Sequence, residues 1–336
     1  VPGTGAPGEK SFRSASQSTD KFIMVVIDKN FKGEVSRDIN DYPEGIVVVI
    51  DKPYRWTSAD VIRKVKYAAI RHFCKKNLKV GHAGTLDPLA TGVLLVCIGN
   101  ACKRAQELQD TGKEYIAGVC FGATTPSYDL EKDIDRTFPT DGVSAETINA
   151  ALPHFLGPQD QVAPLFSAKQ VDGVRAYELA RKLYRDGQPL DEAAKEILQI
   201  SRIDISELEL LGLGLSTSSA KAESDQNFRG GRFQTKRSGV PGTGAPGENS
   251  LVSVAKAEDG HNASNRINVA AMPAGLPVAD IRIACSKGTY IRSFARDIGE
   301  KLGSGAFLSS LCRSRSGEFR VENAISVNDA VTFLSE

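Results

Sequence analysis

One carboxylate, Asp87, has an unusual setting in the stretch VGHAGTLDPLATGVLLV, residues 80–96. Small residues precede it, and a proline and a continuous apolar run follow it. A carboxylate in such a loop can act as a nucleophile or as a general acid or base. It can also cap its own turn, because Asp-Pro readily begins a turn. This window alone leaves the catalytic and the structural interpretation open.

Several kinds of site do not fit the same stretch. It lacks the G-K-[ST] ending of a phosphate-binding P-loop and the G-x-G-x-x-G of a dinucleotide site. In aspartyl-phosphate enzymes the aspartate precedes Lys-Thr-Gly-Thr, whereas Asp87 follows Gly-Thr. A metal site is not indicated either, because the histidines lack paired ligand spacing. There are four of them: His72, His82, His154 and His261.

The flanking sequence predicts the elements that must position Asp87. A buried strand is predicted at 45–53 and an amphipathic helix at 57–73, capped by Thr57 or Ser58. A short apolar strand at 92–99 follows Asp87 directly. Further strands are predicted at 113–123 and 276–288, and helices at 176–187 and 289–303. Strands and helices do not alternate regularly, so the pattern favours an α+β fold.

Five ordered motifs resemble the TruB family of tRNA pseudouridine synthases. They are DKPYRWTS, GHAGTLDPLATGVLLVCIGNACK, KEYIAGVCFGATTPSYD, APLFSAKQVDGVRAYELAR and CSKGTYIRSFARDIG. The resemblance implies the pseudouridine synthase fold, with a largely antiparallel mixed central sheet flanked by helices. It implies conversion of uridine to pseudouridine at position 55, in the T-arm of tRNA, without a cofactor or metal. A synthase for another RNA and an RNA chaperone without turnover are the alternatives.

The same resemblance implies roles for individual residues. Asp87 matches the catalytic aspartate, Tyr115 the tyrosine that stacks on the target base, and Arg292 the arginine that pairs with the aspartate. Substrate contacts are implied for a further set: Lys52, His82, Gly84, Thr85, Tyr290 and Leu311. Where the family usually has Leu-Arg-Arg, this chain has Leu311-Cys312-Arg313.

This chemistry explains the types of these residues. A guanidinium can hold a carboxylate ionised and match both of its oxygens. The target uridine must leave its stack, and an aromatic face can replace the lost stacking. Small residues before Asp87 would let the loop approach the extruded nucleotide closely. The sequence does not decide whether the aspartate attacks the sugar or assists a glycal route.

Composition limits the class of protein. The 336 residues are 41% hydrophobic and 25% charged, and no apolar run of 18 residues occurs. We see no secretory signal, and the six cysteines lack a C-x-x-C pair, which predicts reduced thiols and a cytoplasmic enzyme. The net charge is only +1, so RNA binding requires a local basic surface. Residues 63–79 are basic, which fits either a solvated helix face or a phosphate-binding surface.

The sequence predicts one catalytic domain, residues 44–215 and 276–336. Residues 1–43 are predicted as an N-terminal extension with a flexible start, and 216–275 as a low-complexity, disordered insertion. The segments VPGTGAPGE at the start and at 240–248 are duplicates, typical of a linker. We expect a monomer of the short family form, without the C-terminal RNA-binding PUA domain, that needs no protein partner.

Overall fold

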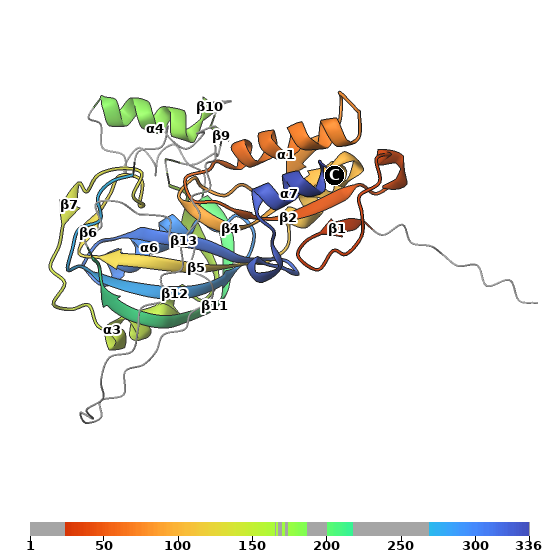
Figure 1. The fold of residues 1–336 in the computed structure, drawn as a ribbon. Helices are drawn as coiled ribbons and strands as arrows, with labels where there is room; N and C mark the ends of the chain where they lie inside the picture. The colour runs from red at the N-terminus through yellow and green to blue at the C-terminus, as the bar shows by residue number, and fades with distance from the viewer. Residues whose placement is uncertain are drawn as a thin grey trace, which may run out of the picture.

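The computed structural model describes residues 24–164, 166, 170–171, 174–186, 200–217 and 269–335. One large sheet organises these residues, with strand order β1-β2-β4-β13-β5-β12-β11-β8 (Figure 1). Two pairs, β1 with β2 and β4 with β13, are parallel, and the other neighbours on this path are antiparallel. The fold is therefore α+β around a largely antiparallel mixed sheet, as the sequence predicted.

The strands of this sheet are β1 (Val25–Ile27), β2 (Ile46–Lys52), β3 (Val80–His82), β4 (Ala90–Ile98), β5 (Lys113–Phe121), β8 (Gly157–Val162), β11 (Ile200–Leu215), β12 (Pro277–Cys285), β13 (Ala306–Ser316) and β14 (Phe319–Arg320). Two small sheets pair β6 (Ala123–Thr124) with β7 (Arg136–Thr137) and β9 (Gln170–Val171) with β10 (Val174–Arg175). The α-helices are α1 (Ser58–His72), α2 (Ala105–Gln109), α3 (Ala145–Ala151), α4 (Ala176–Arg185), α6 (Ile291–Lys301) and α7 (Val327–Phe333).

The main core lies between the sheet and the helices α1, α3, α6 and α7. The predicted apolar face of α1 is buried, with Val61, Val65 and Ala69 fully inside. Thr57 caps this helix in a capping box, accepting from the backbone N–H of Asp60 while the Asp60 carboxylate accepts from Thr57. The start of α1 is therefore fixed locally, which matters because it touches the loop that carries Asp87.

The predicted domain limits need extending. Residues 24–43, placed by the sequence in a separate extension, belong to the folded domain: β1 adds to the sheet and Ile27 is 1% exposed. The ends of the predicted insertion also pack on the domain. The Ser216 N–H donates to Leu276 O at 2.8 Å, and Ala270 is buried with its N–H on Leu130 O. The start of the extension, 1–23, and the centre of the insertion, 218–268, with both copies of the duplicated segment, lie outside the described residues.

The six cysteines are free thiols, as predicted from their spacing. Among the described residues, no helix is long and apolar enough to cross a membrane.

Candidate active site

Asp87 lies in the loop that joins β3 to β4, and this loop is tied down along its length. At its start the Ala83 N–H donates to Leu95 O at 2.9 Å. In the middle the Ser58 hydroxyl, at the first turn of α1, donates to Leu86 O and accepts from Leu86 N–H. After Asp87, Pro88 O accepts from the Arg55 N–H at 2.9 Å. These contacts hold the carboxylate on a rigid frame, with its side chain 39% exposed.

Arg292, in the first turn of α6, pairs with this carboxylate. Its Nε lies 2.9 Å from Asp87 Oδ2, and its side chain is only 5% exposed. The two terminal nitrogens do not reach the carboxylate: Nη1 donates to Ser127 O at 3.2 Å and Nη2 to Phe166 O at 2.8 Å. Burial lowers the pKa of Arg292, but the charges of the neighbouring carboxylates outweigh this effect and raise it overall. The predicted pair is present, but the predicted two-oxygen fork is not, because the backbone occupies two arms of the guanidinium.

A second carboxylate, Asp129, shares the same arginine, and its role was not predicted from the sequence. Its Oδ2 lies 3.8 Å from Arg292 Nε, and its side chain is 9% exposed. Its Oδ1 accepts from the Ser127 hydroxyl at 2.6 Å and from the Glu131 N–H at 2.9 Å. Burial raises the pKa of Asp129, against the lowering effect of Arg292 and these hydrogen bonds. The signal was available, because Asp129 ends the motif KEYIAGVCFGATTPSYD.

Tyr115 lies on β5, directly across the sheet from Arg313 on β13. It is 9% exposed, and its hydroxyl hydrogen-bonds with the Arg313 guanidinium. Burial raises the pKa of Tyr115, and the charge of Arg313 opposes the increase, so the phenol is neutral at pH 7. Tyr115 is thus a fixed, protonated side chain in the interior beside the Asp87 loop.

Arg313 is a further residue whose role was not predicted from the sequence. It is 2% exposed, and every arm of its guanidinium is used. Its Nε donates to Val93 O at 2.7 Å, and its terminal nitrogens donate to Thr85 O and Gly84 O at 3.4 and 3.2 Å. Arg313 therefore clamps the loop before Asp87 to the strand after it.

The residues predicted to contact substrate lie around this loop in different settings. Thr85 is exposed, while His82, Gly84, Tyr290 and Leu311 are half-buried. Gly84 has φ +92°, a backbone conformation that glycine adopts far more easily than other residues. Burial and the charge of Arg313 lower the pKa of His82. Tyr290 packs against a small apolar cluster that includes Phe166, and its backbone bonds with the Gln161 side chain.

Lys52 does not fit the prediction of a direct substrate contact. Its side chain is fully buried, and its ammonium donates to the backbone carbonyls of Pro53, Trp56 and Pro88 at 2.9, 2.6 and 3.2 Å. Burial lowers its pKa to about 7, although Asp87 raises it. Lys52 joins the start of α1 to the residue after Asp87, so the structure gives it a role in positioning the loop.

Asp87 and Arg292 open into a pocket between the loop and β13. The pocket is lined by Asp87, Leu89, Ala90, Asp129, Arg292, Leu308, Ser309, Ser310 and Leu311. Its volume is about 20 Å³, room for about one water molecule.

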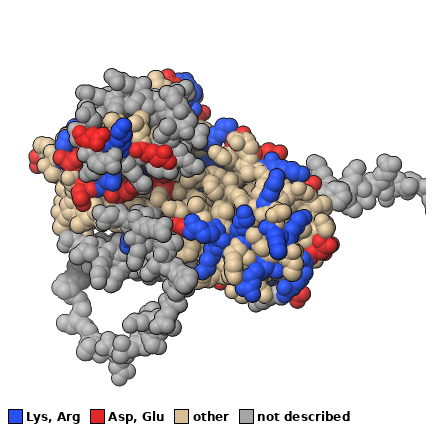
Figure 2. All heavy atoms as spheres, turned by 90° about the horizontal axis from the view of Figure 1, so that it is seen from above, with Lys and Arg blue, Asp and Glu red and all other residues tan. Residues whose placement is uncertain are grey.

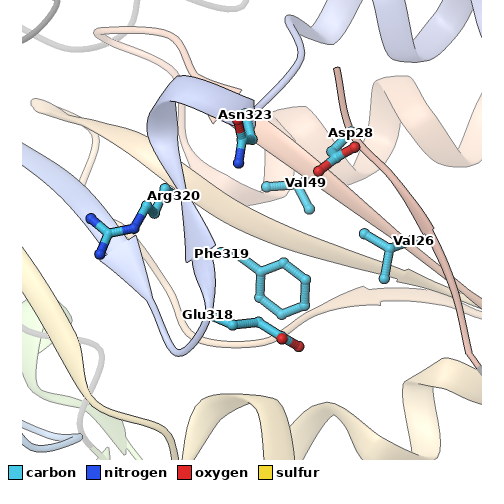
Figure 3. Close-up of a pocket in the computed structure, with 7 residues that line it drawn as sticks. All are labelled: Val26, Asp28, Val49, Glu318, Phe319, Arg320 and Asn323. Carbon is cyan, nitrogen blue, oxygen red and sulfur yellow. The ribbon is translucent and has the colours of Figure 1, made fainter. Parts of the chain in front are cut away.

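A second, larger pocket of about 270 Å³ lies between β1, β2 and the β13–β14 hairpin (Figure 3). Asp28 and Glu318 lie on opposite sides of the Phe319 ring there, and Arg320 is the one basic side chain in the lining. None of these lining residues belongs to the five motifs, whereas Asp87, Asp129 and Arg292 all do. The Asp87 pocket is therefore the better candidate for the active site.

Comparisons with known proteins decide the family. Residues 71–221 match the N-terminal domain of the TruB family pseudouridylate synthases. The chain is 39% identical to tRNA pseudouridine synthase B of Phocaeicola vulgatus, over 88% of this chain and 96% of that protein.

The chain belongs to the TruB family of pseudouridine synthases.

Other relatives of the same name agree. The synthase of Flavobacterium johnsoniae is 36% identical, over 85% of this chain and 95% of the relative. The synthase of Thermus thermophilus is 35% identical, over 83% of this chain and 75% of the relative. Among solved structures, a chain in a Cbf5-Nop10-Gar1 complex is similar with a TM-score of 0.48 and 24% identity. That match covers 86% of this chain and 54% of the other.

Proposed function

We propose that this TruB-family enzyme converts uridine 55, in the T-arm of tRNA, to pseudouridine with Asp87 as its catalytic carboxylate. Relatives aligned over most of their length are tRNA pseudouridine synthases, which supports isomerisation of uridine in tRNA. The observation that carries the role of Asp87 is its ion pair with buried Arg292, at 2.9 Å, at the mouth of a pocket.

The reaction breaks the bond between N1 of uracil and C1′ of ribose, turns the base, and joins C5 to C1′. The proton on C5 leaves and N1 gains one, so no group is gained or lost overall. Asp87 would attack the sugar or assist a glycal route, and Arg292 would keep it ionised and oriented. Both routes need a carboxylate that the nucleotide can reach, and the Asp87 side chain is 39% exposed beside Arg292.

A buried tyrosine completes the proposal. The target nucleotide would leave its stack to reach Asp87, and Tyr115 would lie beside it. The Tyr115 hydroxyl would move a proton when the base detaches and rejoins. Its neutral state suits this role, because burial raises its pKa.

An Asp87→Asn variant tests the proposal. It keeps the shape and removes the charge, so isomerisation should stop while tRNA binding persists. Single-turnover conversion is measured on a tRNA transcript, and pseudouridine is mapped by position. Asp28→Asn, a carboxylate of the other pocket, is the control and should keep the wild-type rate.

The outcomes separate the candidates. Substantial turnover by Asp87→Asn would refute the catalytic role. Pseudouridine at another tRNA position or in another RNA would refute the T-arm assignment. Binding by wild type without any turnover would favour an RNA chaperone.

The proposal includes a monomer that acts without a protein partner, in the cytoplasm. Light scattering of the purified chain, with turnover measured on the same sample, tests both points.

A further inference from the structure

Charge is unevenly distributed along this nearly neutral chain. Residues 61–106 contain nine Lys and Arg but a single carboxylate, Asp87. The chain has 42 basic and 41 acidic residues, which leaves 33 basic and 40 acidic residues elsewhere, a net charge of −7. Figure 2 looks down on α1: blue gathers over the half of the face that α1 occupies, and red over the other half.

The basic residues of this segment form one exposed surface, here called the α1 surface. It consists of Lys64, Lys66 and Arg71 on α1 and Lys75, Lys76 and Lys79 in the connection to β3, all exposed. Arg63 starts the same helix face but pairs with Asp60 at 2.9 Å. Among the described residues, no carboxylate lies within ion-pair distance of the six cations of the α1 surface.

A solvated helix face usually carries both signs, because acidic and basic side chains four residues apart stabilise each other. The α1 surface lacks that compensation. Arg71 lies near the C-terminus of α1, where the helix dipole favours a cation. Lys75, Lys76 and Lys79 lie beyond the last turn, within which that effect acts. An anion from outside the chain would relieve the mutual repulsion of these cations.

An aromatic side chain stands within these cations. Tyr67 is 67% exposed, and no other aromatic residue is among the large exposed apolar side chains of the described structure. The Arg71 guanidinium carbon lies 5.6 Å from the centre of its ring. Arg63, Tyr67 and Arg71 are each four residues apart, so they form a stripe along α1. Cations around an exposed ring suit single-stranded or unstacked nucleotides, whose phosphates and bases meet both groups.

The α1 surface is also connected to the active site at both ends. The helix begins at Ser58, which bonds with Leu86 in the Asp87 loop. The connection after the helix leads through β3 into the same loop. The 15 residues of α1 are about 22 Å long, enough to follow an RNA strand past several phosphates.

We propose that the α1 surface binds the tRNA outside the isomerised nucleotide, through phosphates, with Tyr67 as a platform on which an unstacked base lies. This rests on the proposed function, because the target nucleotide must occupy the Asp87 pocket at the same time. The surface contributes affinity, and the chemistry at Asp87 does not depend on it.

The charge is tested with a triple variant, Lys64→Ala/Lys66→Ala/Lys76→Ala. The control is Lys32→Ala/Lys301→Ala/Arg320→Ala, which removes three exposed cations outside the α1 surface. Affinity for a full-length tRNA transcript is measured as a function of salt concentration. Every cation that neutralises a phosphate steepens the slope of log affinity against log salt by about 0.7–0.9. We therefore expect a slope smaller by about 2 for the triple variant, at least tenfold weaker binding at low salt, and no such change in the control.

The platform is tested by Tyr67→Ala beside Tyr67→Phe. Stacking on an aromatic side chain is worth about 1–3 kcal/mol per base, so Tyr67→Ala should bind at least about fivefold more weakly, with an unchanged salt slope. Tyr67→Phe keeps the ring and should bind like wild type. Single-turnover rates at saturating enzyme should stay normal in all these variants.

The proposal is overturned if the triple variant matches its control, or if Tyr67→Ala binds as tightly as Tyr67→Phe. Loss of turnover at saturating enzyme in the triple variant would also overturn it, because the α1 surface would then act in the chemistry. Failure of the proposed function is distinguishable, because wild type would then bind tRNA without converting it, whatever the variants do.

Discussion

Replacing Arg292 by lysine keeps the positive charge beside Asp87 but removes the three-sided geometry of the guanidinium. Arg292 reaches Asp87, Ser127 O and Phe166 O from three different nitrogens, at 2.9, 3.2 and 2.8 Å. An ammonium is a single point of attachment and cannot span these groups. At least one buried carbonyl therefore loses its donor, or Asp87 loses its partner.

The expected size follows from these contacts. A hydrogen bond to a charged group contributes about 1.5–3 kcal/mol, and the variant loses one or two of them. The free energy of unfolding should therefore fall by about 2–5 kcal/mol, a large part of the 5–15 kcal/mol typical of a domain. Asp87 also loses its fixed orientation, and removal of one preorganised charged donor typically slows an enzyme by about 10²–10³.

Urea unfolding gives the stability, and single-turnover conversion of a tRNA transcript gives the rate. Arg320→Lys, at an exposed position, is the control and should leave both unchanged. A variant Arg292→Lys within 0.5 kcal/mol of wild type, a margin on the order of surface substitutions, would show that the two carbonyls do not depend on Arg292. A rate within a few-fold of wild type would show that Asp87 needs only a nearby charge.

Three further predictions concern the groups around the loop. Arg313→Met removes the donors to Gly84 O, Thr85 O and Val93 O, so unfolding free energy should fall by about 3 kcal/mol or more, with faster amide exchange in the loop; unchanged exchange would refute the clamp. Burial lowers the pKa of Lys52 to about 7, so the folded protein releases this proton above pH 7, whereas the unfolded chain keeps it up to about pH 10.4. The free energy of unfolding should therefore increase with pH in this range, by up to about 1.4 kcal/mol per pH unit. Lys52→Met lacks this titration. Urea unfolding should therefore show the stability of wild type rising relative to that of Lys52→Met between pH 7 and 9, and a constant difference would mean that the carbonyls keep the ammonium charged. Tyr115→Phe should bind tRNA normally but lower the single-turnover rate by about two to four orders of magnitude; a loss of only a few-fold would leave Tyr115 as a stacking platform.

Local sequence patterns predicted the elements in which the spacing of apolar residues marks the buried face. The strand at 45–53 and the helix at 57–73 were found because their apolar residues follow the periods of a strand and a helix, and Thr57 supplies a local cap. The central strand β13 was not predicted. Its sequence AFLSSLCRSRS has serines and arginines where a buried strand usually has apolar residues. Those polar residues are accommodated because Arg313 bonds with backbone carbonyls across the sheet, a contact that sequence periodicity does not contain.

The candidate site was predictable in part for the same reason. The resemblance of the motifs brought Asp87, Tyr115 and Arg292 into one hypothesis, and the structure places Asp87 and Arg292 2.9 Å apart. The resemblance did not show that backbone carbonyls would occupy two nitrogens of Arg292. The resemblance also gave no role to Asp129 or Arg313, because the role of a buried charged residue depends on which strands and loops meet around it.

The buried cations around Asp87 differ in a way that explains why two of them are arginines. Arg292 and Arg313 each satisfy several carbonyls with separate nitrogens, and burial does not make a guanidinium give up its charge. Lys52 meets three carbonyls from one nitrogen, and burial lowers its pKa to about 7. A carboxylate that must stay charged therefore has an arginine as its direct partner, while the lysine holds the backbone behind it.

Because α6 and β13 are consecutive helix and strand, residues 291–316 supply both arginines. The loop with Asp87 is thus held from two sides by one continuous segment, and a shift between α6 and β13 would move the partner of Asp87 relative to the loop that carries it.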